Sequence, residues 1–156
     1  MKTVWMLLAS LLLTGCARQD HARIGSLEVL APWSRETPLA ANVAAGYLSI
    51  HNHGQRDDRL LAVESAAVRR VDIHQMWMDD GVMRMRPLAD GLPIPAGETV
   101  VLAPGGSHLM FIAPARHAVA GDRLDAVLVF RDAGRLPMSF EVRGLSAQGG
   151  APHAHH

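Results

Sequence analysis

The stretch "HQMWMDDGVMRMR", residues 74–86, decides the class of fold because it encodes a β-hairpin. The Asp-Gly pair at 80–81 separates two runs of alternating character, and such a pair suits the positive φ angles of a two-residue turn. Outward from it, short apolar runs such as "SLEVLAPW", "AGYLSI", "HLMFIAP" and "RLDAVLVF" are separated by Gly, Pro and Asp. Only "PLAANVAAG" has a helical composition, and it is short. The pattern predicts a single all-β sandwich or barrel.

A two-residue loop also predicts which side chains share a face, because side chains alternate along a strand. One face would carry His74, Met76, Met78, Met83 and Met85. The other face would carry Gln75, Trp77, Arg84 and Arg86. A three-residue loop would reverse the parity of the second strand and separate His74 from Met85.

Two interpretations of these methionines stay open. Methionine fills irregular cores well, and for Met78 and Met83 a core role explains the sequence at least as well as any other. A core role explains His74 less well, because a buried imidazole needs a hydrogen-bond partner. It also does not explain His108 and Met110 in "SHLMF", which repeat the i, i+2 spacing of histidine and methionine at the start of the hairpin.

The second interpretation is a soft-metal site, since two His/Met pairs on adjacent strands can converge on one small ion. Thioethers are poor ligands for zinc, calcium and magnesium, and good ligands for Cu(I). A blue-copper electron-transfer centre needs a cysteine thiolate, and the single cysteine, Cys16, lies in the N-terminal segment. The residues therefore favour Cu(I) held by imidazole and thioether, with Met76 as an auxiliary sulfur by its face and spacing.

Residues 1–16 have the pattern of a bacterial lipoprotein signal. Lys2 precedes an apolar run that ends at Leu13, and "LTGC" resembles a lipobox with Cys16 as the lipidated residue. The run is short for a membrane span, which needs about 20 apolar residues; a secretory signal without lipidation is the nearer alternative. The expected location is the periplasm, with a lipid anchor to the cell envelope. The remaining segments are then a tether at 17–24, a copper-binding β-sandwich domain at 25–144 and a flexible histidine-containing tail at 145–156.

Charge and motifs exclude other classes of function. Basic and acidic residues both number 15, and no basic run interleaved with aromatics is present, so nucleic acid is not an expected partner. No Ser-His-Asp arrangement, carboxylate pair or glycine-rich phosphate loop predicts an enzyme. Four further histidines are expected at the surface: His21, His51, His53 and His117. The tail histidines are either Cu(II) ligands or part of a plain polar tail: His153, His155 and His156.

The chain resembles the periplasmic copper chaperones of the PCu(A)C family. Their pattern is roughly His, about ten residues, Met, about twenty-one residues, then His-x-Met. Here ten residues separate His74 from Met85, and twenty-two separate Met85 from the His-x-Met at 108–110, one more than in the family pattern. Stretches such as "APWSRETP", "AAGYLSIHNHG" and "IPAGETVVLAPGGSHLMF" are also similar, so the resemblance covers about residues 27–142.

The resemblance implies a cupredoxin-like Greek-key β-sandwich or barrel that binds one Cu(I) through His74, Met85, His108 and Met110. It also implies delivery of copper to the cytochrome c oxidase subunit that carries Cu(A), with a thioredoxin-like copper assembly protein as a second partner. Two alternatives remain. One is an envelope protein for copper sequestration or resistance, with the same site. The other is a metal-free β-sandwich assembly lipoprotein with a methionine-rich core.

Overall fold

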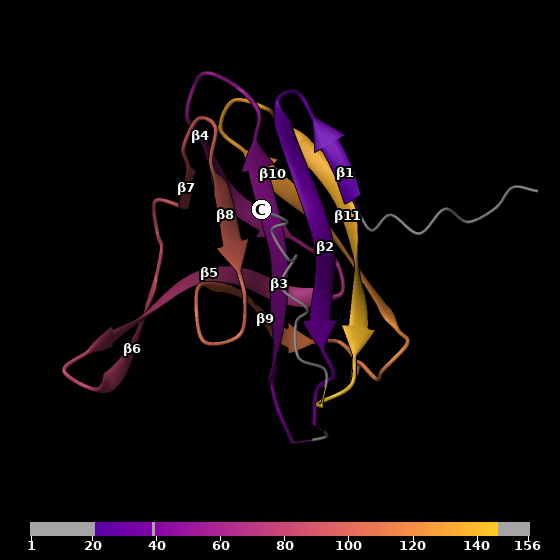
Figure 1. The fold of residues 1–156 in the computed structure, drawn as a ribbon. Coiled ribbons are helices and arrows are strands. Elements are labelled where there is room, and N and C mark those ends of the chain that lie inside the picture. The colour runs from indigo at the N-terminus through magenta and orange to yellow at the C-terminus, as the bar shows by residue number, and fades with distance from the viewer. Residues whose placement is uncertain (1–20, 39, 147–156) are drawn as a thin grey trace, which may run out of the picture.

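The computed structural model describes residues 21–38 and 40–146, and within these ranges the chain is all-β, without a helix (Figure 1). The strands are β1 (His21–Ile24), β2 (Leu27–Arg35), β3 (Val43–Asn52), β4 (Asp58–Glu64), β5 (Val68–Asp79), β6 (Val82–Pro87), β7 (Leu92–Ile94), β8 (Thr99–Leu102), β9 (His108–Pro114), β10 (Arg123–Phe130) and β11 (Arg135–Arg143). The described part of the chain thus contains no helix that could cross a membrane. The predicted all-β class is confirmed.

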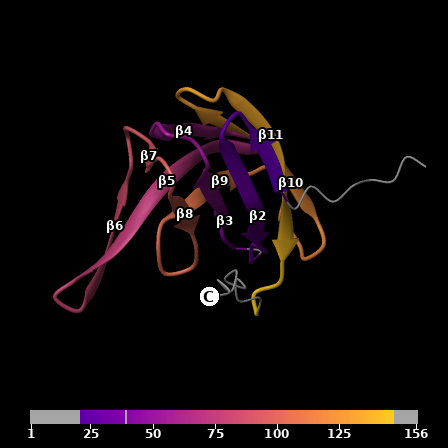
Figure 2. The same cartoon turned by 45° about the horizontal axis from the view of Figure 1, so that its top comes forward.

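The strands are linked in one hydrogen-bonded sheet that curves around a common interior (Figures 1 and 2). Their order is β6-β5-β9-β3-β2-β11-β10-β4-β7, with β1 beside β2 and β8 beside β3. Neighbours are antiparallel except β11 and β2, which run parallel. In this order β6 is the terminal strand, and only β5 pairs with it.

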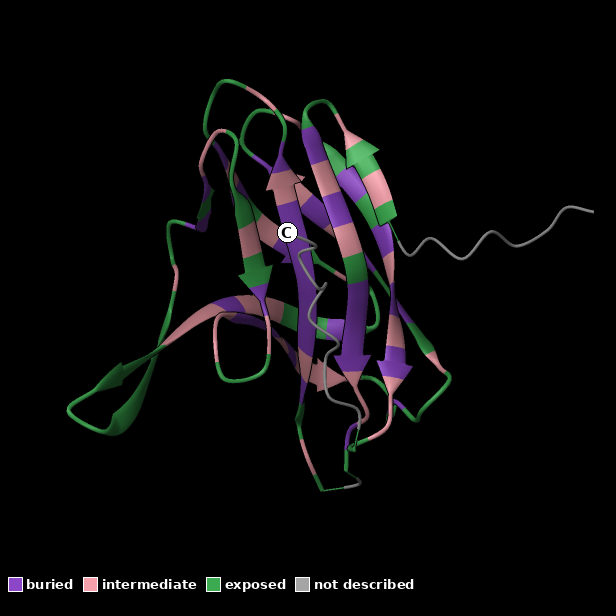
Figure 3. Cartoon of the chain, viewed as in Figure 1, coloured by how far each residue is buried: buried purple, intermediate pink, exposed green. Residues whose placement is uncertain are grey.

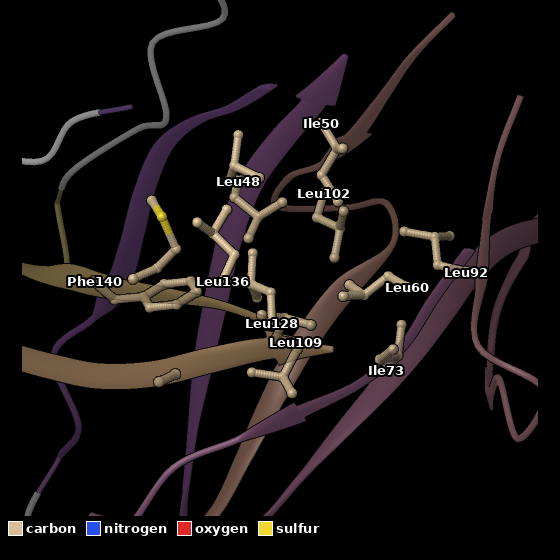
Figure 4. Close-up of a cluster of buried hydrophobic side chains, with 14 of the residues drawn as sticks. Leu48, Ile50, Leu60, Ile73, Leu92, Leu102, Leu109, Leu128, Leu136 and Phe140 are labelled. Carbon is tan, nitrogen blue, oxygen red and sulfur yellow. The ribbon is translucent and has the colours of Figure 1, made fainter. Parts of the chain in front are cut away.

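The core unites strands that are far apart in the sheet order. Phe111 of β9 meets Phe140 of β11 edge to face, with ring centroids 5.4 Å apart. Figure 4 shows Leu48, Leu109 and Leu128 gathered in the same interior as Phe140. Burying a side chain of this size stabilises a fold by roughly 1.5–3 kcal/mol, so this cluster helps to hold the distant strands of the sheet together.

One close approach in this core positions β9, the strand that carries the second His/Met pair. Gly46 of β3 pairs with Leu109 of β9. A Cβ atom added at Gly46 would lie 2.3 Å from Cε2 of the buried Phe111 ring. The missing side chain therefore lets the aromatic ring fill the space beside β3 and hold β9 against it.

Strand β1 corrects the expected start of the domain. The polar composition of residues 17–24 predicted a tether, but residues 21–24 pair with 27–30 of β2. Ala22 and Ile24 pack against the core from this strand, a two-residue alternation too short to be recognised in the sequence. The predicted signal at 1–16, the rest of the tether, and the tail from residue 147 onward lie outside the described residues.

Candidate metal centre

The hairpin of β5 and β6 forms with the predicted loop and register. Asp80 and Gly81 have φ angles of 46° and 79°, as a two-residue type I′ turn requires. The even loop keeps His74 and Met85 on one face of the hairpin. The methionines pair directly across it, Met76 with Met85 and Met78 with Met83.

The second His/Met pair lies on the neighbouring strand and on the same face. The ladder of β5 and β9 places His74 opposite His108, and Asp72 opposite Met110. The two imidazole centroids are 5.8 Å apart. A residue that is two positions before or after the directly opposite residue on the paired strand is a diagonal neighbour, about 7–8 Å away. Met110 on one side of β5 and Met85 on the other are both diagonal neighbours of His74. The structure therefore brings the four predicted ligands together around His74, and Met76 follows on the same strand.

The backbone holds His108 in one tautomer. This residue is buried, and its Nδ1 lies 3.0 Å from the carbonyl oxygen of Gly106. A carbonyl oxygen only accepts hydrogen bonds, so Nδ1–H is the donor and the neutral ring keeps its lone pair on Nε2. Histidines that bind metals commonly donate their other N–H in this way, which fixes the direction of the ligating nitrogen.

The surroundings of His74 favour its uncharged form, and one of its ring nitrogens has no hydrogen-bond partner. Burial lowers the pKa of His74 below its ordinary value of 6.5, and the nearby His108 lowers it further, while Asp72 acts in the opposite direction. Within the described residues, Nδ1 of His74 is buried and has no hydrogen-bond partner. A buried polar atom normally has a partner, and a metal ion would supply one to this nitrogen. A neutral imidazole beside a second imidazole and thioether sulfurs fits a bound soft cation.

The hairpin methionines are exposed, and this rules out a core role for them. The exposed fractions are 61% for Met78, 46% for Met83 and 52% for Met85. Beyond His74, β6 is the one strand in the described part of the chain that pairs with β5, and the hairpin projects from the sandwich (Figures 1 and 3). The core interpretation is therefore wrong for these three residues. The methionine that does fill the core is Met138 on β11, which is 3% exposed.

The opposite face of the hairpin supplies contacts that stabilise it. The Arg86 guanidinium lies over the Trp77 ring, 5.4 Å from its centroid, and donates a hydrogen bond to Oε1 of Gln75. Arg84 donates to Asp79 at 2.8 Å. Exposed cation–π contacts are worth about 0.5–1 kcal/mol and exposed ion pairs up to about 1 kcal/mol. The predicted arginine face is present, and Arg84 and Arg86 lie on the side of the hairpin opposite the methionines.

Asp72 lies on the same face as His74 and the hairpin methionines, and the sequence did not lead us to it. It precedes His74 by two residues on β5, and its Oδ2 lies 4.0 Å from Nε2 of His74. Arg70 donates to both of its carboxylate oxygens, at 3.0 and 3.1 Å. Side chains two residues apart on a strand share a face, and the same rule that put Met76 beside His74 also puts Asp72 there. The carboxylate places one negative charge beside the candidate centre.

Other donor sets are less suitable. In residues 21–38 and 40–146, no group of three or more His, Cys, Asp or Glu side chains is arranged to hold a metal ion. A metal at the His74 face would therefore depend on methionine sulfur, which favours a soft ion such as Cu(I) over zinc or calcium.

The four remaining histidines within the described chain take no part in this face. His51 makes a hydrogen bond of 2.7 Å with Thr99, and His53 one of 2.8 Å with Glu28. His21 and His117 are exposed, as predicted. The predicted Cys16 and tail sites, which include His153, His155 and His156, lie outside the described residues.

A curved all-β sandwich with paired histidines and exposed methionines on one edge defines a cupredoxin-like domain of the PCuAC type. Solved structures share this fold. A domain described as "Copper-bound PCuAC domain from PmoF2" is 27% identical, covers 80% of this chain and 97% of that domain, and has a TM-score of 0.68. The apo PCuAC domain from PmoF1 is 26% identical, with 80% and 98% covered and a TM-score of 0.68. Apo-DR1885 from Deinococcus radiodurans, 18% identical with 95% and 99% covered and a TM-score of 0.61, shares the fold.

The chain belongs to the family described as "Putative lipoprotein LpqE-like", whose model matches residues 27–142. A relative described as a "Putative lipoprotein" from Leifsonia xyli subsp. xyli (strain CTCB07) is 26% identical over 141 residues, which cover 86% of this chain and 84% of the relative. The resemblance to PCuAC proteins is thus confirmed at the level of fold and family.

Proposed function

We propose that this protein is an extracytoplasmic metallochaperone that carries one Cu(I) ion. The ligands are His74, Met85, His108 and Met110, with Met76 as an auxiliary sulfur. The observation that carries the proposal is the register around His74, which has an imidazole directly opposite and a thioether diagonally on each side. Mixed imidazole and thioether ligation without a thiolate suits Cu(I). The likeness to a copper-bound PCuAC domain supports copper as the metal.

The exposure of the site supports transfer rather than redox chemistry or turnover. Met85 is half exposed on the edge hairpin, whereas His108 is buried against the sandwich. A partner can therefore replace the outer sulfur first while the buried imidazole still holds the ion. Each step exchanges one ligand for another, copper remains Cu(I), and the thioether carries no proton to release.

The proposed recipient is the cytochrome c oxidase subunit that carries the Cu(A) centre, with a thioredoxin-like copper assembly protein as a second partner. This assignment rests on the resemblance to the PCu(A)C chaperones. Lipid attached to Cys16 would hold the protein at the periplasmic membrane surface, in line with the lipoprotein descriptions of its family and relative. The histidine tail would capture Cu(II), and a separate one-electron reductant would convert it to Cu(I) before it passes to the site around His74.

The test is a pair of measurements on copper-free protein. Anaerobic titration against a chromophoric Cu(I) chelator should give one tightly bound Cu(I), and His108→Ala should weaken it at least about tenfold, or about 1.4 kcal/mol. His117→Ala, at an exposed histidine away from the site, is the matched control and should bind as the unmodified chain does.

The second measurement separates delivery from sequestration. The copper-loaded chain is mixed with the soluble Cu(A)-bearing domain of the oxidase subunit, and copper on each protein is followed. Net transfer supports delivery. Tight Cu(I) retention in the presence of that acceptor would favour copper sequestration instead, and no Cu(I) binding at all would leave a metal-free assembly role.

A further inference from the structure

The pair Met78 and Met83 at the end of the hairpin is explained neither by the core nor by the site around His74. Both are exposed, and they face each other across β5 and β6. They lie one step further from the sandwich than the pair Met76 and Met85, on the same face. We call Met78 and Met83 the tip sulfur pair.

The tip sulfur pair is not needed to hold the hairpin in shape. The turn is fixed by the positive φ angles at 80–81, and the opposite face supplies the Arg86–Trp77 stacking and the Arg84–Asp79 ion pair. Exposed strand positions favour Val, Ile, Thr and aromatic residues, and methionine has no advantage there by propensity. An exposed methionine also buries little apolar surface. The local structure therefore gives no stabilising reason for two thioethers at these positions.

The ladder places the sulfurs in reach of one another. Side chains directly opposite in an antiparallel pair have Cβ atoms about 4.5–5.5 Å apart, and diagonal neighbours are about 7–8 Å apart. Met78 and Met83 are directly opposite, and Met76 is a strand neighbour of the first and a diagonal neighbour of the second. Methionine has three rotatable bonds, so three such thioethers can turn toward one ion. The arginines of the hairpin lie on the other face and do not repel a cation here.

We infer that Met78, Met83 and Met76 form a second Cu(I) site at the hairpin tip, through which copper passes to and from the site around His74. This inference rests on the proposed function. Three thioethers suit Cu(I) and offer little to harder ions. This tip site has no imidazole ligand, so it binds Cu(I) more weakly than the site around His74, which we call the inner site. Weaker binding is what a transfer point requires. Copper moves inward when Met85 and an imidazole replace the tip sulfurs, with no change of oxidation state and no proton transfer.

The experiment uses the full chain with ¹³C-methyl methionine and titrates it with Ag(I), a redox-stable substitute for Cu(I). The first equivalent should shift the methyl resonances of Met85 and Met110. The second equivalent should shift those of Met78 and Met83. In the double variant Met78→Leu/Met83→Leu the first event should remain and the second should be lost. Met138→Leu, the same change in the core, is the control and should keep both events.

A kinetic measurement completes the test. Release of Cu(I) from the loaded chain to a chelator should slow several-fold in the double variant, while the amount finally transferred stays the same. If Met78 and Met83 do not respond to a second equivalent, or if the double variant takes up two equivalents and releases copper as fast as the original chain, the inference is wrong. That result leaves the inner site intact. Absence of the first event, seen at Met85 and Met110, would instead reject the proposed function itself.

Discussion

Replacing Met85 by leucine separates a ligand role from a structural one. The change roughly conserves side-chain volume and removes the sulfur. Conservative swaps of this kind cost less than about 1.5 kcal/mol even in cores, and surface substitutions usually stay within about 0.5 kcal/mol. Because Met85 is 52% exposed, the smaller figure applies. The free energy of Cu(I) binding should weaken by at least about 1.4 kcal/mol, a tenfold rise in Kd.

Met138→Leu is the matched control, because it makes the same chemical change at a side chain that is 3% exposed on β11. It should lower the melting temperature by a few degrees, given that 1 kcal/mol corresponds to about 2–8 °C for domains of this size range. It should leave Cu(I) affinity unchanged. The assays are thermal unfolding by circular dichroism and anaerobic competition with a Cu(I) chelator. The reasoning is refuted if Met85→Leu unfolds the protein at a much lower temperature but binds Cu(I) normally.

Three further predictions concern the N-terminal segment, the tail and pH. Cys16→Ser should release the protein from the membrane fraction or leave an unprocessed precursor, and a chain starting at Ala17 should still bind Cu(I); loss of that binding would place Cys16 in the metal site. Deletion of residues 150–156 should abolish Cu(II) binding near pH 7 with unchanged Cu(I) affinity, whereas equal Cu(II) binding would make the tail a plain polar segment. In the copper-free protein, NMR should give His74 a pKa below 6.5, because burial and His108 disfavour its charged form. Since the unfolded chain then takes up the proton first, this residue's contribution makes the unfolding free energy fall as pH drops below about 6.5; a measured value above 6.5 would contradict the burial argument.

The hairpin could be predicted in detail from the sequence because its determinants are local. The Asp-Gly pair at 80–81 sets the loop length, and the loop length sets the register, so the facing of Met76 and Met85 followed from counting. The shared face of His74 and Met85 followed in the same way. The expected convergence of the two His/Met pairs rested on their equal spacing, and the ladder places them on adjacent strands with His74 directly opposite His108.

The burial of the hairpin could not be predicted, because it depends on where distant strands end. β9 begins at His108, directly opposite His74, so no strand of the described residues pairs with the last residues of β5 on that side. This is why Met78 and Met83 are exposed although their alternation is equally typical of a core strand. Strand β1 was missed for a related reason: four residues gain a strand conformation only through pairing with β2. Asp72 could have been predicted, because it precedes His74 by two residues on the same strand and therefore shares its face.

The proposed site requires imidazole nitrogen and methionine sulfur to bind the same Cu(I) ion. X-ray absorption spectroscopy of the chain loaded with one equivalent of Cu(I) tests this directly, because nitrogen and sulfur scatter at different distances and amplitudes. The expected result is a mixed shell with sulfur from Met85 and Met110 and nitrogen from His74 and His108. A shell of nitrogen and oxygen alone, without sulfur, would contradict it.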